Sequence, residues 1–258
     1  MTLAALLLAL AGAGQADHVG RIYAYLRSNR DGTEAERVYV YRAARDRIEV
    51  AKMRDRCTNA AFVTADLDLA RGEARRLVAG RLRPNAGHED FGELTYDPAT
   101  QRLDAVVTLP PGTFRESVTV PDQPWHLYDY DLASLTITAQ YRPNRRAHFK
   151  FGLPLILVGS DPAHFLSYLG RADVRYVRTE RHAGYRAYRF EAGGPAFGRR
   201  GGPIWFDAAD GHIIEARWGI PNHSEYRDFQ LRLIWLSDGG PTAWRRLLTA
   251  QFEGCPAR

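Results

Sequence analysis

The stretch VRYVRTERHAGYRAYRFE, residues 174–191, gives the strongest indication of the fold. Residues 174–181 and 185–191 are rich in aromatic and β-branched side chains, and the turn residues His182-Ala183-Gly184 separate them. Glycine adopts positive φ without steric cost, so two such runs around it are typical of a β-hairpin. We therefore expect two adjacent antiparallel strands here.

The same pattern continues toward the C-terminus. Apolar runs at 204–207, 213–218 and 229–235 are separated by turn-forming residues, among them Asp210-Gly211. An Asp-Gly pair between apolar runs is a strong hairpin signal. The glycine-rich residues 193–202 lack the lysine and the following helix of a phosphate-binding loop, so we interpret them as a hairpin loop. The last third of the chain is thus predicted to be an antiparallel meander.

Alternation of apolar and polar residues with a period of two also recurs earlier in the chain. It predicts strands at 38–41, 48–53 and 103–109, the last of which ends before two prolines. The odd positions of 135–141 are apolar and alternate with Thr and Gln, which predicts a half-buried strand. Residues 66–82 fit a strand or a helix equally well.

Two short helices complete the predicted elements. Asp161 is a suitable N-cap and Pro162 a suitable first residue for a helix that ends at Gly170. A second helix is expected around Thr242 to Gln251. The fold class is therefore mainly β, with a curved antiparallel sheet (a half-barrel) packed on one or two short helices. Residues 17–258 contain no repeat or linker, which indicates a single β-rich domain.

Composition excludes several classes of protein. The chain has 258 residues, 45% of them hydrophobic and 25% charged, which rules out a disordered or multi-span membrane protein. The net charge is +5, and the basic residues are all arginine except Lys52 and Lys150. They are interleaved with acids, and no helix-turn-helix, zinc-finger or RNA-recognition motif accompanies them. We therefore expect no nucleic-acid partner.

The first sixteen residues predict a signal peptide. Leu3 to Leu10 is an uninterrupted apolar run, and small residues stand at positions 14 and 16, as signal cleavage after Ala16 requires. The run is too short to span a bilayer, so membrane contact would be at most peripheral. A buried N-terminal helix is the alternative. We expect a periplasmic or secreted protein.

Export makes the two cysteines informative. Cys57 and Cys255 are the only pair available, and a secreted protein rarely keeps free thiols. We expect a disulfide that ties the C-terminal tail to the N-terminal third. The alternative, a nucleophilic cysteine, would need a basic partner and a lowered thiol pKa, for which the neighbouring Arg56 is only a weak indication.

No motif in the sequence specifies a reaction. Ser160 lacks the second glycine of a nucleophile elbow, and no two histidines have metal-binding spacing. We therefore expect no metal and no cofactor, and we assign no catalytic residue. The best candidates for a metal or acid–base site are His126, Asp129 and Asp131 with His212 or His223. Their spacing in the sequence is not specific for such a site.

Large aromatic residues are frequent on the predicted sheet. On a curved sheet such rings can line an apolar ligand groove, or they can fill an ordinary core. The candidate groove residues are Trp125, Tyr188, Trp205, Trp218, Phe229 and Trp235.

The C-terminal meander resembles that of the LolA/LolB-like periplasmic lipoprotein carriers. The resemblance lies in residues 176–190 and in the hairpin at residues 202–215, which has the Trp-x-Asp and Gly pattern of that family at Trp205, Asp207 and Gly211. Residues 219–229 also resemble a segment of a group of exported proteobacterial proteins. The first resemblance implies an incompletely closed antiparallel sheet over a helix, with acyl chains on its concave side.

Three hypotheses about function follow. The first is an exported protein that binds a lipid or another hydrophobic small molecule on the concave face, as an envelope assembly or carrier factor. The second is a periplasmic hydrolase or lyase acting on an envelope polymer, with its site among the His and Asp residues named above. The third is interaction with another envelope protein through an exposed sheet edge.

Overall fold

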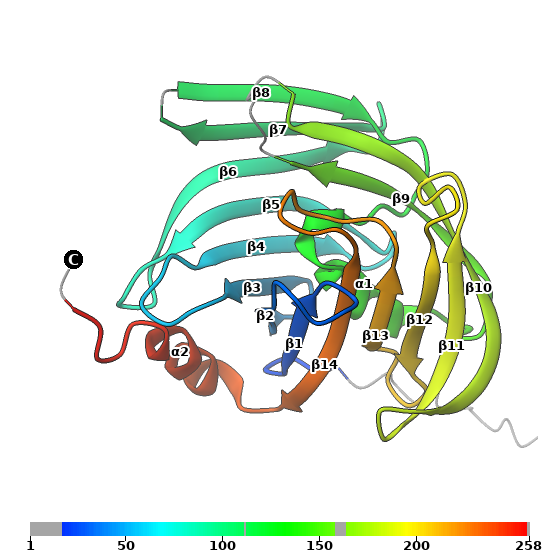
Figure 1. Ribbon diagram of the computed structural model, residues 1–258. Helices are drawn as coiled ribbons and strands as arrows, with labels where there is room; N and C mark the ends of the chain where they lie inside the picture. Colours follow the sequence, from blue (N-terminus) through cyan, green and yellow to red (C-terminus); the bar gives the residue numbers. More distant parts are fainter. Residues whose placement is uncertain (1–16, 111, 158–163, 257–258) are drawn as a thin grey trace, which may run out of the picture.

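The computed structural model describes residues 17–110, 112–157 and 164–256. Within them, 14 strands form one antiparallel sheet in the order β8-β7-β6-β5-β4-β3-β2-β1-β14-β13-β12-β11-β10-β9. Within β1–β8 and within β9–β14, strands that follow one another in the chain are neighbours, and the pairing of β1 with β14 joins these two halves. The sheet curls strongly but is not closed, and its edge strands are β8 and β9 (Figure 1).

The strands of the first half are β1 (Ile22–Ser28), β2 (Glu36–Ala44), β3 (Arg47–Met53), β4 (Ala61–Asp68), β5 (Glu73–Leu82), β6 (His88–Asp97), β7 (Arg102–Leu109) and β8 (Gly112–Thr119). Those of the second half are β9 (Phe149–Ile156), β10 (Leu166–His182), β11 (Tyr185–Gly193), β12 (Gly202–Asp207), β13 (Ile213–Trp218) and β14 (Phe229–Ser237). The helices are α1 (Ala133–Thr138) and α2 (Gly240–Ala250), with 3-10 turns η1 (Tyr128–Tyr130) and η2 (Ala139–Tyr141).

The predicted meander is confirmed. Strands β10 and β11 pair around a turn at Ala183 and Gly184, with His182 opposite Tyr185. The β12–β13 connection contains Asp210-Gly211, where Gly211 has a φ of 91°. The ambiguous residues 66–82 form the end of β4 and all of β5.

The predicted strand at 135–141 is wrong, because this segment forms α1 and η2. It lies inside the curve of the sheet (Figure 1), and residues 135–140 are all buried. Its polar residues are buried as well, and the Gln140 side-chain amide donates to the Tyr23 hydroxyl at 2.9 Å. Alternation predicts a strand only when one face meets water, and here neither face does.

The predicted helix between Asp161 and Gly170 is wrong over the part that the structure describes. Leu166 to Leu169 belong to β10, because Leu166 pairs with Ile156 of β9. Gly170 has a φ of 113° and lies at an irregularity of this pairing. Asp161 and Pro162 lie outside the described residues. The second predicted helix is confirmed as α2.

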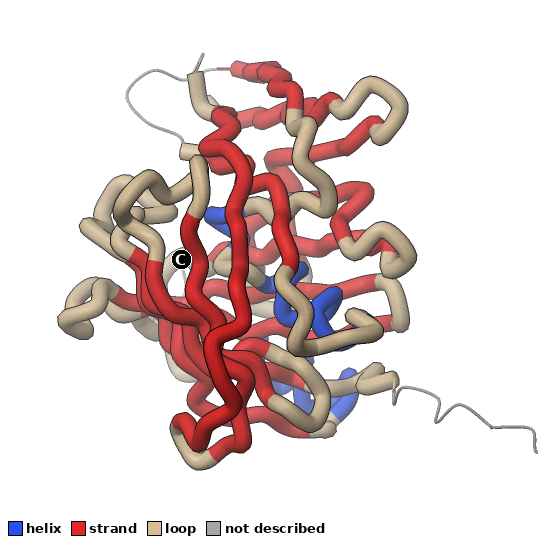
Figure 2. The backbone as a smooth tube through the Cα atoms, turned by 90° about the vertical axis from the view of Figure 1, so that its right-hand side faces the viewer, coloured by secondary structure: helices blue, strands red, loops and turns tan. Residues whose placement is uncertain are grey.

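The core has two main parts, one on each face of the sheet. The larger fills the concave side, where Leu135 and Ile137 of α1 are buried among side chains of the strands. Figure 2, a view turned by 90°, shows the short helical segments in blue among the strands. On the other face of β1 to β4, Trp244 of α2 stacks on Tyr41 at 5.1 Å between ring centroids.

A disulfide between Cys57 and Cys255 confirms the predicted pair and fastens the segment after α2 to the β3–β4 connection. Disulfides persist in oxidising compartments, so the bond favours one weakly. Across the described ranges, the helices are all too short and too polar to cross a bilayer. The predicted signal peptide lies outside the described residues.

Candidate ligand-binding site

A cavity of about 400 Å³ lies between the concave face of β2 to β7 and the segment around η1. Small-molecule sites commonly have volumes of about 300–1,000 Å³. The ends of β9 and of the β13–β14 connection complete the wall. The lining residues are Glu36, Lys52, Ala61, Val63, Leu77, Ala79, Phe91, Gly92, Glu93, Leu94, Val107, Leu127, Asp129, Tyr130, Ile156, Leu157, His223, Ser224 and Glu225.

Most of this wall is apolar because of strand alternation. Leu77, Leu94 and Val107 are buried members of the main core and point to the same concave face. Small residues at Ala79 and Gly92 face the same space. Because their side chains are short or absent, the wall is left unfilled at these positions.

One end of the cavity is polar and charged. The ammonium group of Lys52 lies 2.7 Å from Asp131 Oδ2 and 3.3 Å from His223 Nε2, and it also donates to the Asp129 carbonyl oxygen. Lys52 is on β3, and the two aspartates flank the end of η1. The β13–β14 connection carries His223 and also Asn222, whose side-chain amide donates to Asp131 Oδ1 at 2.7 Å.

A second buried cation shares the same carboxylate. Arg27 Nε lies 3.7 Å from Asp131 Oδ1, and both side chains are fully buried. The guanidinium group also covers the Tyr226 ring and donates to the Asn222 side-chain oxygen. Burial opposes ionisation of Asp131, but the charges of Lys52 and Arg27 hold the pKa of this carboxyl below its usual value.

Asp129 and His223 have shifted pKa values in opposite directions. Burial raises the pKa of Asp129 to about 7, although the charge of Lys52 partly opposes this. Burial and the charge of Lys52 lower the pKa of His223 to about 3. Near neutral pH the cavity therefore presents the neutral imidazole of His223, the Asp129 carboxyl group, which can carry a proton, and the ammonium group of Lys52, beside the lining carboxyl groups of Glu36, Glu93 and Glu225.

The structure brings together only some of the residues that the sequence suggested for a metal or acid–base site. Asp129, Asp131 and His223 meet at Lys52, as described above. His126 is buried elsewhere, with its Nδ1 2.9 Å from Ser134 Oγ, and burial lowers its pKa to about 3.

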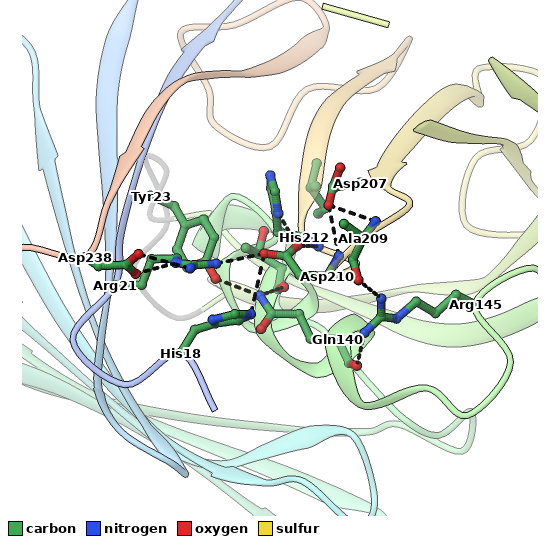
Figure 3. Close-up of polar contacts among 12 residues, drawn as sticks. His18, Arg21, Tyr23, Gln140, Arg145, Asp207, Ala209, Asp210, His212 and Asp238 are labelled. Atoms are coloured by element: carbon green, nitrogen blue, oxygen red, sulfur yellow. Dashed lines mark hydrogen bonds and ion pairs between the residues drawn. The ribbon is translucent and has the colours of Figure 1, made fainter. Parts of the chain in front are cut away.

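His212 belongs to a separate polar cluster (Figure 3). Within the described ranges, ligand atoms of Asp207, Asp210 and His212 lie within 4.8 Å of one another and could hold a cation. Both carboxylates already have partners, because Asp210 Oδ2 lies 2.8 Å from Arg21 Nη1 and Asp207 Oδ2 accepts two backbone N–H groups. The guanidinium group takes the place where a cation would bind Asp210.

Three of the six candidate aromatic residues lie in the main core, and the other three lie elsewhere. Trp218 and Phe229 stack in the main core with centroids 5.6 Å apart, and Trp125 is buried in that core beside Tyr96. Tyr188 lines a different, open cavity. Trp205 belongs to a small cluster on the other face and stacks on His182, whereas Trp235 is 39% exposed.

Sequence reasoning did not select Lys52 or the aliphatic wall. Two features of the sequence nevertheless point to Lys52. It is one of two lysines, and it stands two residues after Val50 and four after Ile48, so its side chain lies on the same, concave face on which those two are buried. The aliphatic wall carries no comparable signal, because its side chains look like those of any core. No family model and no curated protein matches this chain.

Proposed function

We propose that this protein binds a lipid or another hydrophobic small molecule in the cavity between β2–β7 and η1. The observation that carries this proposal is the combination of a largely apolar wall with a polar region that includes Lys52, Asp129 and His223, together with the lining residues Glu36, Glu93, Ser224 and Glu225. Each methylene group buried there contributes about 0.8 kcal/mol to binding. The apolar part of the ligand lies against Leu77 and Leu94, and its polar group faces Lys52.

The place of action we propose is the periplasm or the exterior of the cell. The apolar run at 3–10 with small residues at 14 and 16 supports this, and so does the Cys57–Cys255 disulfide. The proposed binding of a hydrophobic molecule, together with the resemblance of the meander to LolA/LolB-like carriers, leads us to propose a role as an envelope carrier or assembly factor. Contact with another envelope protein is part of such a role.

The test combines native mass spectrometry with ligand titration. Protein purified from a cell envelope is expected to carry a lipid mass, and the purified protein is expected to bind dansyl undecanoic acid. An Ala79→Trp variant fills the cavity and should weaken this binding at least about tenfold, which corresponds to about 1.4 kcal/mol.

The matched control is Val78→Trp, which adds the same ring to the other face of β5. It should bind the dansyl probe as the unmodified protein does. Equal binding by Ala79→Trp and Val78→Trp would refute a site in this cavity, and so would the absence of both a lipid mass and probe binding.

Acid–base catalysis is a second candidate, favoured by one observation. Asp129, with a pKa of about 7, and His223 line the same cavity, and a group that titrates near neutral pH suits proton transfer. The reaction class is a periplasmic hydrolase or lyase acting on an envelope polymer. Turnover of a panel of such polymers, abolished by Asp129→Asn with probe binding retained, would support catalysis over simple binding.

A further inference from the structure

A second cavity, of about 1000 Å³, opens elsewhere on the molecule. It is formed by residues 140–146, by the β12–β13 turn at 208–210, and by His18, Arg21 and Tyr188. The described linings of this cavity and of the candidate ligand site have no residue in common. Figure 3 shows several of its lining residues, among which Arg145 extends toward Ala209 and Arg21 toward Asp210.

The lining of this cavity is strongly basic. It includes the guanidinium groups of Arg21, Arg142, Arg145 and Arg146 and a single carboxylate, that of Asp210. Arg21 is already neutralised, since it lies 2.8 Å from Asp210 and 2.6 Å from Asp238. The one acidic residue of the lining therefore does not balance the other three arginines.

Those three arginines contact only neutral groups among the residues that the structure describes. Arg145 donates to the carbonyl oxygens of Ala209 and Gln140, the latter at 3.3 Å. Arg142 lies over the Phe149 ring at 3.8 Å, and Arg146 lies over the Tyr188 ring at 5.2 Å. These contacts fix the positions of the guanidinium groups and leave their charges uncompensated.

The electrostatic cost of this arrangement is visible at Arg142. Burial lowers the pKa of its guanidinium group to about 10, so the group stays charged at neutral pH in surroundings that disfavour the charge. An anion bound beside Arg142 would offset this cost. A phosphate monoester carries a charge of about −1.5 to −2 and matches the planar forks of guanidinium groups.

We infer that this cavity binds a phosphate-bearing molecule, with the phosphate among the guanidinium groups of Arg142, Arg145 and Arg146. The open cavity has room for more than an ion, so the phosphate belongs to a larger molecule. It comes either from a compound in solution or from a lipid headgroup. This site is additional to the proposed hydrophobic ligand site and does not depend on it.

Calorimetric titration with inorganic pyrophosphate tests the site, together with sedimentation of phosphatidylglycerol vesicles against phosphatidylcholine vesicles. Arg146→Glu is the main variant, because Arg146 is exposed and its replacement leaves the fold intact. It should weaken binding at least about tenfold, since a hydrogen bond to a charged group is worth that much. Arg142→Gln should weaken binding in the same direction.

The matched control is Arg245→Glu, which makes the same charge change on the exposed side of α2. Pyrophosphate binding that Arg146→Glu weakens and Arg245→Glu does not supports a site for phosphate compounds in solution. If the protein binds only the phosphatidylglycerol vesicles, and Arg146→Glu weakens this binding whereas Arg245→Glu does not, the result supports a site for a lipid headgroup. No binding of either probe, or equal losses in Arg146→Glu and Arg245→Glu, overturns the inference.

Discussion

The ammonium group of Lys52 and the carboxylate of Asp131 lie 2.7 Å apart, although 78 residues separate them in the chain between β3 and the end of η1. Asp131 is fully buried and Lys52 nearly so. The pair joins the sheet to the segment inside it, and it places the Lys52 ammonium group in the wall of a largely apolar cavity. Its removal should therefore affect both stability and the site.

Lys52→Met should lower the free energy of unfolding by about 3 kcal/mol, because among the described residues it leaves the buried Asp131 carboxylate with Arg27 as its only ion-pair partner. Chemical denaturation measures the change. The matched control is Lys150→Met, since Lys150 is the other lysine and is exposed on β9. This control should change stability by less than about 0.5 kcal/mol. Equal effects of the two substitutions would contradict the role of the pair.

Asp129 should make stability depend on pH. Its pKa is about 7 in the folded protein and about 3.9 when unfolded, so the folded state holds a proton more tightly. The contribution of this group to stability is full below about pH 4 and falls as the pH rises toward about 7.

Asp129→Asn removes this titration. The unfolding free energy of the unmodified protein, minus that of Asp129→Asn, should therefore decrease between about pH 5 and about pH 8. His223 titrates in the opposite sense but is present in both proteins, so the difference isolates Asp129. A difference that is flat or rises over this range would show that the Asp129 pKa is not raised.

The disulfide should contribute substantially to stability. Cys57 and Cys255 are 198 residues apart in the chain, and removal of a native disulfide commonly costs about 2–5 kcal/mol. The Cys57→Ser, Cys255→Ser double variant should unfold at lower denaturant concentration. Limited proteolysis should cut it first after α2, where the bond holds the chain to the β3–β4 connection. Identical denaturation curves with and without the bond would refute this expectation.

Gly152 marks a close approach between β9 and the segment before η1. A Cβ atom at this position would lie 2.4 Å from the Asp122 carbonyl oxygen and 2.9 Å from a Val120 methyl group. Gly152→Ala should therefore destabilise the protein by about 1–3 kcal/mol, measured by thermal unfolding. Gly112→Ala on β8, where a Cβ would meet nothing within 4 Å, is the control and should have little effect. A melting temperature unchanged in Gly152→Ala would contradict the close approach.

Local features of the sequence determined much of the sheet. Turn residues such as Ala183-Gly184 and Asp210-Gly211 specify hairpins through their own backbone preferences, without help from distant residues. The Cys57–Cys255 pair followed from cysteine content, and α2 followed from its own sequence. Each of these predictions rests on chemistry confined to a few adjacent residues.

Only the tertiary structure decided what occupies the concave side and what remains open there. Residues 135–141 alternate like a strand yet form a helical segment, because they pack inside the curve of the sheet against the apolar side chains of the main core. The alternation of buried residues along β3 places Lys52 on the concave face, but its partners Asp131 and His223 come from distant segments of the chain. The wall of the cavity is left unfilled where Ala79 and Gly92 pair directly between β5 and β6, and this pairing depends on strand register rather than on the sequence around either residue.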